Sequence, residues 1–307
     1  MLIAVLTAVA VFCVSAFAAG ANVSGYERLK AAGFNFVEQI NKKDGFYSNG
    51  SYWINTALYL DGAEMFRAEQ AILKDGARTF MQETEYYAQD ALFPFGRSMN
   101  FVDGIYGKNT LTYNDDEVFY RWSDDGSFTS GQNRWGGFRG YYGGESEYDG
   151  AIPPAQKRFI EALTDALVGE TRNYFVTDGN MISISLSGNQ IPELAQFAIA
   201  AIAERAGGDL KTISNMSIGE DARFTKGMLE VELNDEGFGV NAKMFVEIES
   251  TVDGKQQTYR FETEAISRNI GSTELQRPDG NENGRPSLPS PDGGSTGVTY
   301  AQAAASI

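Results

Sequence analysis

Residues 229–265 read LEVELNDEGFGVNAKMFVEIESTVDGKQQTYRFETEA. Apolar and charged residues alternate in three runs, and the turn sequences Asp235-Glu236-Gly237 and Asp253-Gly254 separate them. A period of two places successive side chains on opposite faces of a strand, and Asp-Gly between two such runs is a strong hairpin signal. The stretch therefore predicts an antiparallel meander with one apolar and one charged, wet face. The predicted apolar face consists of Leu229, Val231, Leu233, Met244, Val246, Ile248, Tyr259, Phe261, Thr263 and Ala265.

A second meander is predicted between residues 51 and 122. Asp61-Gly62 and Asp75-Gly76 separate alternating runs, and a further hairpin is expected around Asn114-Asp115-Asp116. One face of its first strand is predicted to hold Tyr52, Ile54, Leu58 and Leu60.

Helical periodicity occurs in three segments, Ser24–Ile40, Pro153–Val168 and Gln190–Arg205. Ser24 is placed to cap the first helix with Glu27 three residues later, and Asn189 is placed to cap the third. The apolar side predicted for the second helix is Phe159, Ile160, Leu163, Leu167 and Val168. The third helix has the most complete stripe, made of Ile191, Leu194, Ala195, Ala198, Ile199 and Ile202. A short strand, Met181–Leu186, is predicted before it.

Two meanders with helices before and between them predict an α+β fold, in which one large curved antiparallel sheet wraps helices. The start Ser24–Lys30, the Asp-Gly hairpins and the segment Leu186–Ala195 together resemble exported proteins of Gram-positive bacteria with a LolA-like lipoprotein-carrier fold. The resemblance spans roughly residues 24–271 and implies an open β half-barrel around helices, with an apolar cavity and no shared catalytic residues.

The two ends of the chain differ from the middle. Met1–Ala19 is uncharged and apolar, and Ala16-Phe17-Ala18 fits a signal-peptidase site, although no Lys or Arg precedes the apolar run. We expect a cleaved signal peptide or, alternatively, a membrane anchor over residues 2–19, and in either case export to the cell envelope or the medium. Gly271–Ile307 is rich in Pro, Gly, Ser and Asn, which predicts a disordered tail. The expected organisation is a leader (1–19), a single domain (20–270) and a tail (271–307).

Composition excludes several kinds of chemistry. The chain has no His, and its single Cys, Cys13, lies in the leader, so no Ser-His-Asp or Cys-His nucleophile and no zinc, iron–sulfur or His-ligated haem site is expected. We predict neither a metal nor a cofactor. With 25 basic and 41 acidic residues the net charge is −16, which disfavours nucleic acid and anionic membranes as partners. Membrane contact is expected only through the leader, if it stays attached.

The segment Ser123–Gly150, rich in Gly and aromatic residues, predicts a long surface loop. It could form a lid over an apolar cavity or stack on sugar rings, or its aromatic side chains could simply dock on the domain. Its Arg-Gly-Gly character also resembles nucleic-acid-binding segments, which export and acidity argue against. The candidate ligand-binding residues are Trp135, Phe138, Tyr141 and Tyr142 in this loop, and Leu194, Ala198, Ile199 and Ile202 on the third helix. The helix stripe could line a ligand cavity, but such a stripe is more often simply core.

Acidic residues gather in two turns, Asp115-Asp116-Glu117 and Asp124-Asp125. Calcium binding is conceivable there, but neither group has EF-hand spacing, and turn chemistry explains both more simply. The function expected from the sequence is an exported, non-enzymatic protein that holds a lipid or another apolar molecule between sheet and helices. The alternatives are a structural or sensory surface domain that binds another protein, such as an envelope protein, and an exported carboxylate-dependent glycoside hydrolase.

Overall fold

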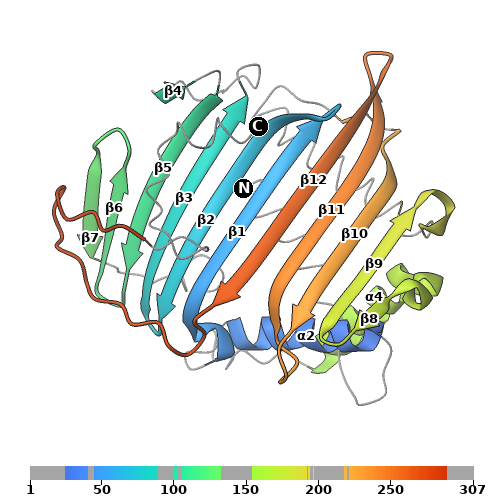
Figure 1. Ribbon diagram of the computed structural model, residues 1–307, viewed down its shortest axis with the longest axis horizontal. Helices are drawn as coiled ribbons and strands as arrows, with labels where there is room; N and C mark the ends of the chain where they lie inside the picture. Colours follow the sequence, from blue (N-terminus) through green and yellow to red (C-terminus); the bar gives the residue numbers. More distant parts are fainter. Residues whose placement is uncertain are drawn as a thin grey trace.

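The protein is built on one open antiparallel sheet (Figure 1). The computed structural model describes residues 25–40, 45–88, 100–102, 105–132, 154–191, 193, 196, 218–219 and 221–288. The strand order is β7-β6-β5-β3-β2-β1-β12-β11-β10-β9-β8, with β4 paired to β5. The strands are β1 (Asn49–Leu60), β2 (Ala63–Asp75), β3 (Arg78–Ala88), β4 (Asn100–Val102), β5 (Ile105–Asn114), β6 (Val118–Ser123), β7 (Phe128–Gln132), β8 (Val176–Asp178), β9 (Met181–Ser187), β10 (Arg223–Leu233), β11 (Gly239–Val252) and β12 (Lys255–Arg268).

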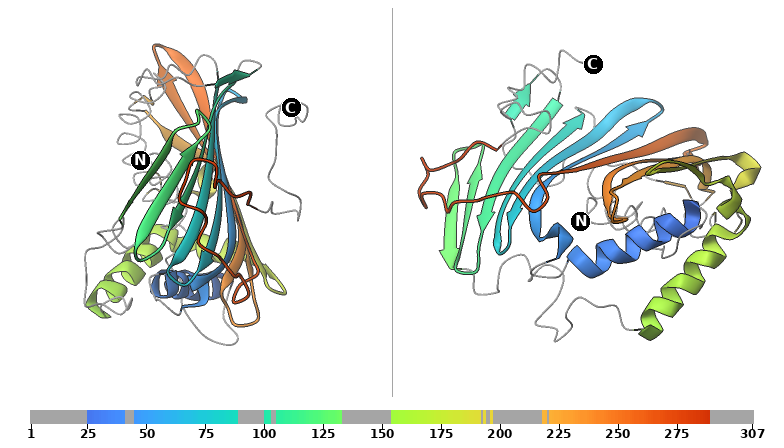
Figure 2. Two further views of the ribbon diagram at one scale, coloured as in Figure 1. Left: turned by 90° about the vertical axis from the view of Figure 1, so that its left-hand side faces the viewer. Right: turned by 60° about the horizontal axis from the view of Figure 1, so that its bottom comes forward.

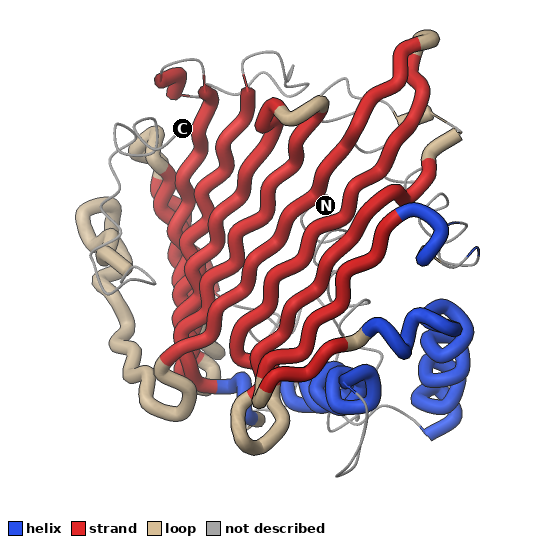
Figure 3. Tube along the Cα trace, turned by 45° about the vertical axis from the view of Figure 1, so that its right-hand side comes forward, coloured by secondary structure: helices blue, strands red, loops and turns tan. Residues whose placement is uncertain are grey.

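The two α-helices lie near the same end of the strands (Figure 3), and the structure also describes three short 3₁₀-helices. They are the α-helices α2 (Gly25–Ile40) and α4 (Pro154–Val168) and the short 3₁₀-helices η1 (Phe46–Ser48), η2 (Gly169–Tyr174) and η3 (Gly188–Gln190). The first two predicted helices are therefore confirmed, and so are both meanders and the short strand before residue 187. The prediction of a large curved antiparallel sheet is confirmed too, and within the described residues it is not closed into a barrel.

The Asp-Gly hairpins form as predicted at two places. Asp61 and Gly62 have φ angles of 50° and 85°, and Asp253 and Gly254 have φ angles of 50° and 76°. Positive φ at both central residues is the type I′ geometry that matches the twist of the strands. At the third place, the paired residues Asp75 and Arg78 enclose Gly76-Ala77, so the turn begins one residue later than the sequence pattern indicates.

The two meanders are joined by the long-range pairing of β1 with β12, which runs from Ser51 opposite Arg268 to Leu60 opposite Tyr259. This pairing makes one sheet out of two, and it brings residues about 200 positions apart into register.

Helix α2 packs on one face of the β8–β12 half of the sheet (Figure 2, right). Tyr26, Leu29 and Ala32 of α2 are buried against β9 and β10. The sheet residues of this cluster are Ile182, Ile184, Leu229, Val231 and Leu233. We call the face that carries them the α2 face. It is the face predicted to be apolar from residues 229–265.

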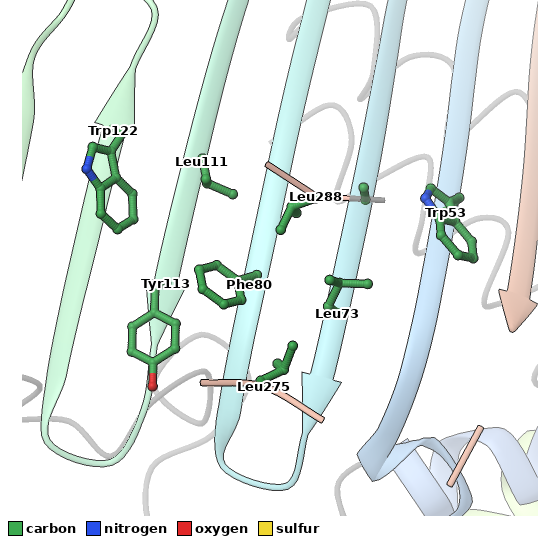
Figure 4. Close-up of a cluster of buried hydrophobic side chains, with 9 residues drawn as sticks. Trp53, Leu73, Phe80, Leu111, Tyr113, Trp122, Leu275 and Leu288 are labelled. Carbon is green, nitrogen blue, oxygen red and sulfur yellow. The ribbon is translucent and has the colours of Figure 1, made fainter. Parts of the chain in front are cut away.

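The other half of the sheet is covered on the opposite face. Trp53 is adjacent in β1 to Ile54, which lies on the α2 face, so the two side chains point to opposite sides. Trp53 belongs to a cluster that the figure shows along β1–β6 (Figure 4). Its members are Trp53, Ala71, Leu73, Phe80, Leu111, Tyr113, Trp122, Leu275 and Leu288.

The last two members lie in residues 271–288, which we call the strap. Leu275 and Leu288 are 7% and 3% exposed. This differs from the expectation of disorder from Gly271 onward, because an apolar groove on the sheet buries the two leucines of an otherwise polar segment. Residues 289–307 lie outside the described residues, as does the leader 1–19.

Two further expectations differ from the structure. The predicted loop 123–150 begins with a strand, β7, whose Phe128 packs on Trp122 with ring centroids 5.5 Å apart. On α4, Phe159 is 67% exposed and does not join an apolar side. The helix predicted over 190–205 falls mostly outside the described residues. Its first residue, Gln190, is the last residue of the short helix η3.

Candidate functional site

The α2 face carries three rows of side chains that run across five strands in register. One row is Ile182, Val231, Ala242, Ala265 and Ile54. The next is Ile184, Leu229, Met244, Thr263 and Thr56. The third is Leu186, Gly227, Val246, Phe261 and Leu58, continued in β2 by Phe66. Every side chain in these rows is apolar or carries a hydroxyl.

The hydroxyls in the middle row satisfy each other, because Thr56 and Thr263 lie directly opposite with their Oγ1 atoms 3.4 Å apart. The third row extends past the cluster under α2 and is nonetheless shielded, since Leu58, Phe66 and Phe261 are 0%, 5% and 8% exposed. The α2 face therefore presents a continuous apolar wall, partly buried and partly half-buried, and α2 packs on only one end of it.

A polar junction fastens α2 to α4 beside this wall. The Tyr26 hydroxyl donates a hydrogen bond to Asp165, and Lys30 Nζ lies 2.9 Å from Asp165 Oδ1. Burial, followed by the hydrogen bond to Asp165, raises the pKa of Tyr26. Desolvation acts to raise the pKa of Asp165, but hydrogen bonds from Lys30 and Tyr26 outweigh it and lower that pKa. Lys30 is only 7% exposed and is paired with Asp165. A buried lysine–carboxylate pair can indicate a catalytic site, but here the pair has a structural role, because it joins α2 to α4.

The same strands are charged on their other face. Lys243 bonds Glu264 across β11 and β12 with a distance of 2.8 Å from Nζ to Oε1, and Arg260 bonds Glu262 with a distance of 2.6 Å from Nε to Oε1. Phe245 lies beneath the Arg260 guanidinium, 4.3 Å from ring centroid to Cζ. The charged side chains pair with one another, which suits a face in contact with water.

The acidic turns are used within the fold. Asp115 accepts hydrogen bonds from the Tyr113 hydroxyl and from the backbone N–H groups of Glu117 and Val118, and it pairs with Arg277 of the strap. In the second turn the carboxylates accept hydrogen bonds from backbone N–H groups, Asp124 from Asn109 and Asp125 from Ser127. In the part of the chain that the structure describes, no group of three or more His, Cys, Asp or Glu side chains is arranged to hold a metal ion.

None of the candidate ligand-binding residues named from the sequence can be placed. Trp135, Phe138, Tyr141, Tyr142, Leu194, Ala198, Ile199 and Ile202 all lie outside the described residues. The structure does describe the α2 face, whose apolar alternation the sequence predicted.

The groove that receives the strap was missed, although its signal is present in the sequence. Strand β1 carries Trp53 between Tyr52 and Ile54, and β3 carries Phe80 beside Met81. Apolar residues at adjacent positions of a strand lie on opposite faces, so both faces of the strand must be covered. The sequence therefore indicates a second covering layer. Leu275 and Leu288 of the strap belong to this second covering layer.

Comparisons with known proteins do not identify a family. No family model and no curated protein matches the chain. Among solved structures it is similar to a porin-like protein from Bacteroides uniformis, with 10% identity over 72% of this chain and 96% of that one and a TM-score of 0.19. It is also similar to the bifunctional dehydratase-cyclase domain in ambruticin biosynthesis, with 15% identity over 72% of this chain and 75% of that one and a TM-score of 0.15. At these scores neither similarity carries an argument about fold or function.

Of the helices that the structure describes, none has both the length and the apolar character that a bilayer span requires.

Proposed function

We propose that the protein is an exported, non-enzymatic binding protein that holds a lipid or another apolar molecule against the α2 face. One observation supports the proposal: the apolar wall is continuous over five strands and extends beyond the strands on which α2 packs. A sheet that needed only to pack α2 would require apolar residues only beneath that helix. An apolar wall of larger extent suits a ligand that offers apolar surface, because burying such surface contributes about 25 cal/mol per Å².

The LolA-like resemblance of the sequence agrees with this proposal, since such carriers hold lipid groups between a curved open sheet and helices. The open antiparallel sheet with α2 on one face is compatible with that architecture. Export rests on the apolar leader alone.

The test is native mass spectrometry of the full chain produced through an export pathway, followed by solvent extraction and identification of the released molecules. We expect a stoichiometric apolar adduct that extraction removes. A matched pair of variants locates it: Phe261→Ala alters the α2 face, whereas Phe245→Ala removes a ring of the same size from the opposite face one strand away.

Loss of the adduct in Phe261→Ala and its retention in Phe245→Ala support the proposal, provided that both variants keep the circular dichroism of the parent. An apo mass together with no uptake from lipid vesicles refutes it. That result leaves the structural or sensory domain that binds another protein. An adduct lost equally in both variants also refutes binding at the α2 face.

A further inference from the structure

The strap contains a pattern of oxygen-bearing side chains that the proposed function does not use. Residues 279–284 read Asp-Gly-Asn-Glu-Asn-Gly. Side-chain oxygens thus stand at the first, third and fifth positions, and Gly stands at the sixth. This is the spacing of the first half of an EF-hand calcium loop, in which the Gly permits a sharp turn. The twelfth position is Ser290 instead of the usual Glu, so the pattern corresponds to a weaker site.

The loop is closed on itself. The Asn281 N–H donates to the carbonyl of Asp279 over 2.9 Å, and the Gly284 N–H donates to the carbonyl of Asn281 over 3.1 Å. A Cβ at position 284 would lie 2.2 Å from the Asp279 carbonyl oxygen, so only Gly fits there. These six residues and Phe128 line a shallow depression that is open to solvent. The first and last positions of the pattern are therefore brought together around an open space.

The carboxylate of Asp279 is available to a ligand, whereas Asn281 Oδ1 already accepts a hydrogen bond from the N–H of Asn283 over 2.9 Å and offers a ligand only its second lone pair. Asp279, Asn281 and Asn283 are exposed, and among the described interactions none uses the carboxylate of Asp279. The carboxylates of Asp115, Asp124 and Asp125 differ from that of Asp279, because each already accepts a hydrogen bond from a backbone N–H group. The net charge of −16 also favours the approach of a cation.

The sheet holds the loop in place from outside. Trp122 Nε1 donates to the carbonyl of Asn281 over 2.9 Å, and Gly280 approaches Tyr120 so closely that a Cβ would lie 2.7 Å from the ring. Past the loop, the Arg285 side chain donates to Asn109 of β5. The position of the loop is thus fixed independently of any ion, and an indole ring adjoins it.

We propose that Asp279–Gly284 is a calcium site. Its protein ligands are the side-chain oxygens of Asp279, Asn281 and Asn283 and the backbone carbonyl of Arg285 at the seventh position, and water completes the coordination. With a single carboxylate among the ligands, the site belongs to the weak class found in extracellular modules, with a Kd of about 0.1–1 mM. The site does not depend on ligand binding at the α2 face.

The test is a titration of the full chain with Tb³⁺ while its emission is excited through tryptophan, followed by competition with calcium chloride. We expect saturable emission that calcium displaces. Asp279→Ala abolishes it, whereas Glu274→Gln, which removes a carboxylate from the same strap outside the loop, leaves it unchanged. Asn283→Asp adds a second carboxylate ligand at an exposed position and lowers the Kd for calcium by about tenfold, since ligand charge sets affinity in such loops.

Three outcomes overturn the proposal. The first is no saturable emission in the parent chain. The second is equal loss in Asp279→Ala and Glu274→Gln, which indicates diffuse binding to an acidic surface. The third is an unchanged calcium Kd in Asn283→Asp, a result that stays informative even if Asp279→Ala does not fold.

Discussion

Replacing Asp115 by Ala tests how the strap is fastened to the sheet. This carboxylate is 7% exposed and has four donors: the Tyr113 hydroxyl at 2.8 Å, two backbone N–H groups of its own turn at 2.8 and 2.9 Å, and the Arg277 guanidinium. Arg277 Nη2 lies 2.7 Å from both Asp115 Oδ2 and Glu117 Oε2. The carboxylate therefore joins the β5–β6 turn to the strap.

The expected loss of unfolding free energy follows from the donors that Asp115→Ala leaves without an acceptor. The buried Tyr113 hydroxyl loses its acceptor, which costs about 1–3 kcal/mol, and each turn N–H loses a bond with a net value of about 0.5–1.5 kcal/mol. Arg277 keeps Glu117 and is 43% exposed, so its contribution is screened and adds little. We expect Asp115→Ala to lower the free energy of unfolding by about 2–6 kcal/mol.

The same residue gives a pH dependence. Desolvation acts to raise the pKa of Asp115, but hydrogen bonds from Val118, Glu117, Tyr113 and Arg277 outweigh it and hold that pKa below its ordinary value. Between the folded pKa and the unfolded value of about 3.9, the unfolded chain binds more protons than the native chain, so stability rises with pH. The contribution is present in full above about pH 4–5 and is lost as the pH falls through the folded pKa. Asp115→Ala removes this part of the acid dependence.

The assay is urea unfolding followed by tryptophan fluorescence at neutral and at acidic pH. The matched control is Asp116→Ala, because its side chain is the exposed neighbour in the same turn. We expect the control to stay within about 0.5 kcal/mol of the parent chain. Equal stabilities of the two variants at neutral pH, or an unchanged acid dependence in Asp115→Ala, would refute the reasoning.

Three other predictions concern separate parts of the fold. Leu275→Ala should lower the free energy of unfolding by about 2 kcal/mol or more by emptying the strap groove, measured by urea unfolding, whereas the exposed neighbour Gln276→Ala should not. Asp165→Ala should lower Tm, because the buried Tyr26 hydroxyl loses its acceptor and Lys30 keeps only the longer pairing with Glu27 at 3.8 Å. A Tm equal to that of Glu161→Ala, one turn earlier on α4, would contradict this. Gly62→Ala should lower the free energy of unfolding by about 1 kcal/mol, measured by thermal unfolding, because φ is 85° at this position. Gly62→Asn should be less destabilising than Gly62→Ala, since Asn tolerates the left-handed region.

Local patterns in the sequence predicted much of the fold. The alternation in residues 229–265 identified the strands and the apolar face of β10–β12, and registers such as Val246 opposite Phe261 confirm that face. The Asp-Gly pairs located the tight turns of both meanders, and the spacing of apolar residues located α2 and α4. These features depend on contacts between residues near in sequence, where backbone sterics and side-chain period decide the outcome.

The candidate site was predicted only in part. The apolar wall could be predicted because its rows repeat the alternation of each strand. The residues expected to face it, such as Leu194 and Trp135, fall outside the described residues, so their role stays a prediction. The calcium pattern at Asp279–Gly284 is readable in the sequence, but its segment, poor in apolar residues, was expected to be disordered.

The sequence by itself determined the period of each strand, the turns between neighbours and the two ordered α-helices, because all of these follow from interactions within a few residues. Only the tertiary structure decided that β1 pairs with β12, that α2 covers one face in one half of the sheet, and that the strap covers the other face in the other half. The strap shows the reason most clearly. Leu275 and Leu288 cannot offset the entropy of ordering a polar segment, until Trp53, Phe80 and Trp122, which are distant in sequence, form a groove that buries them.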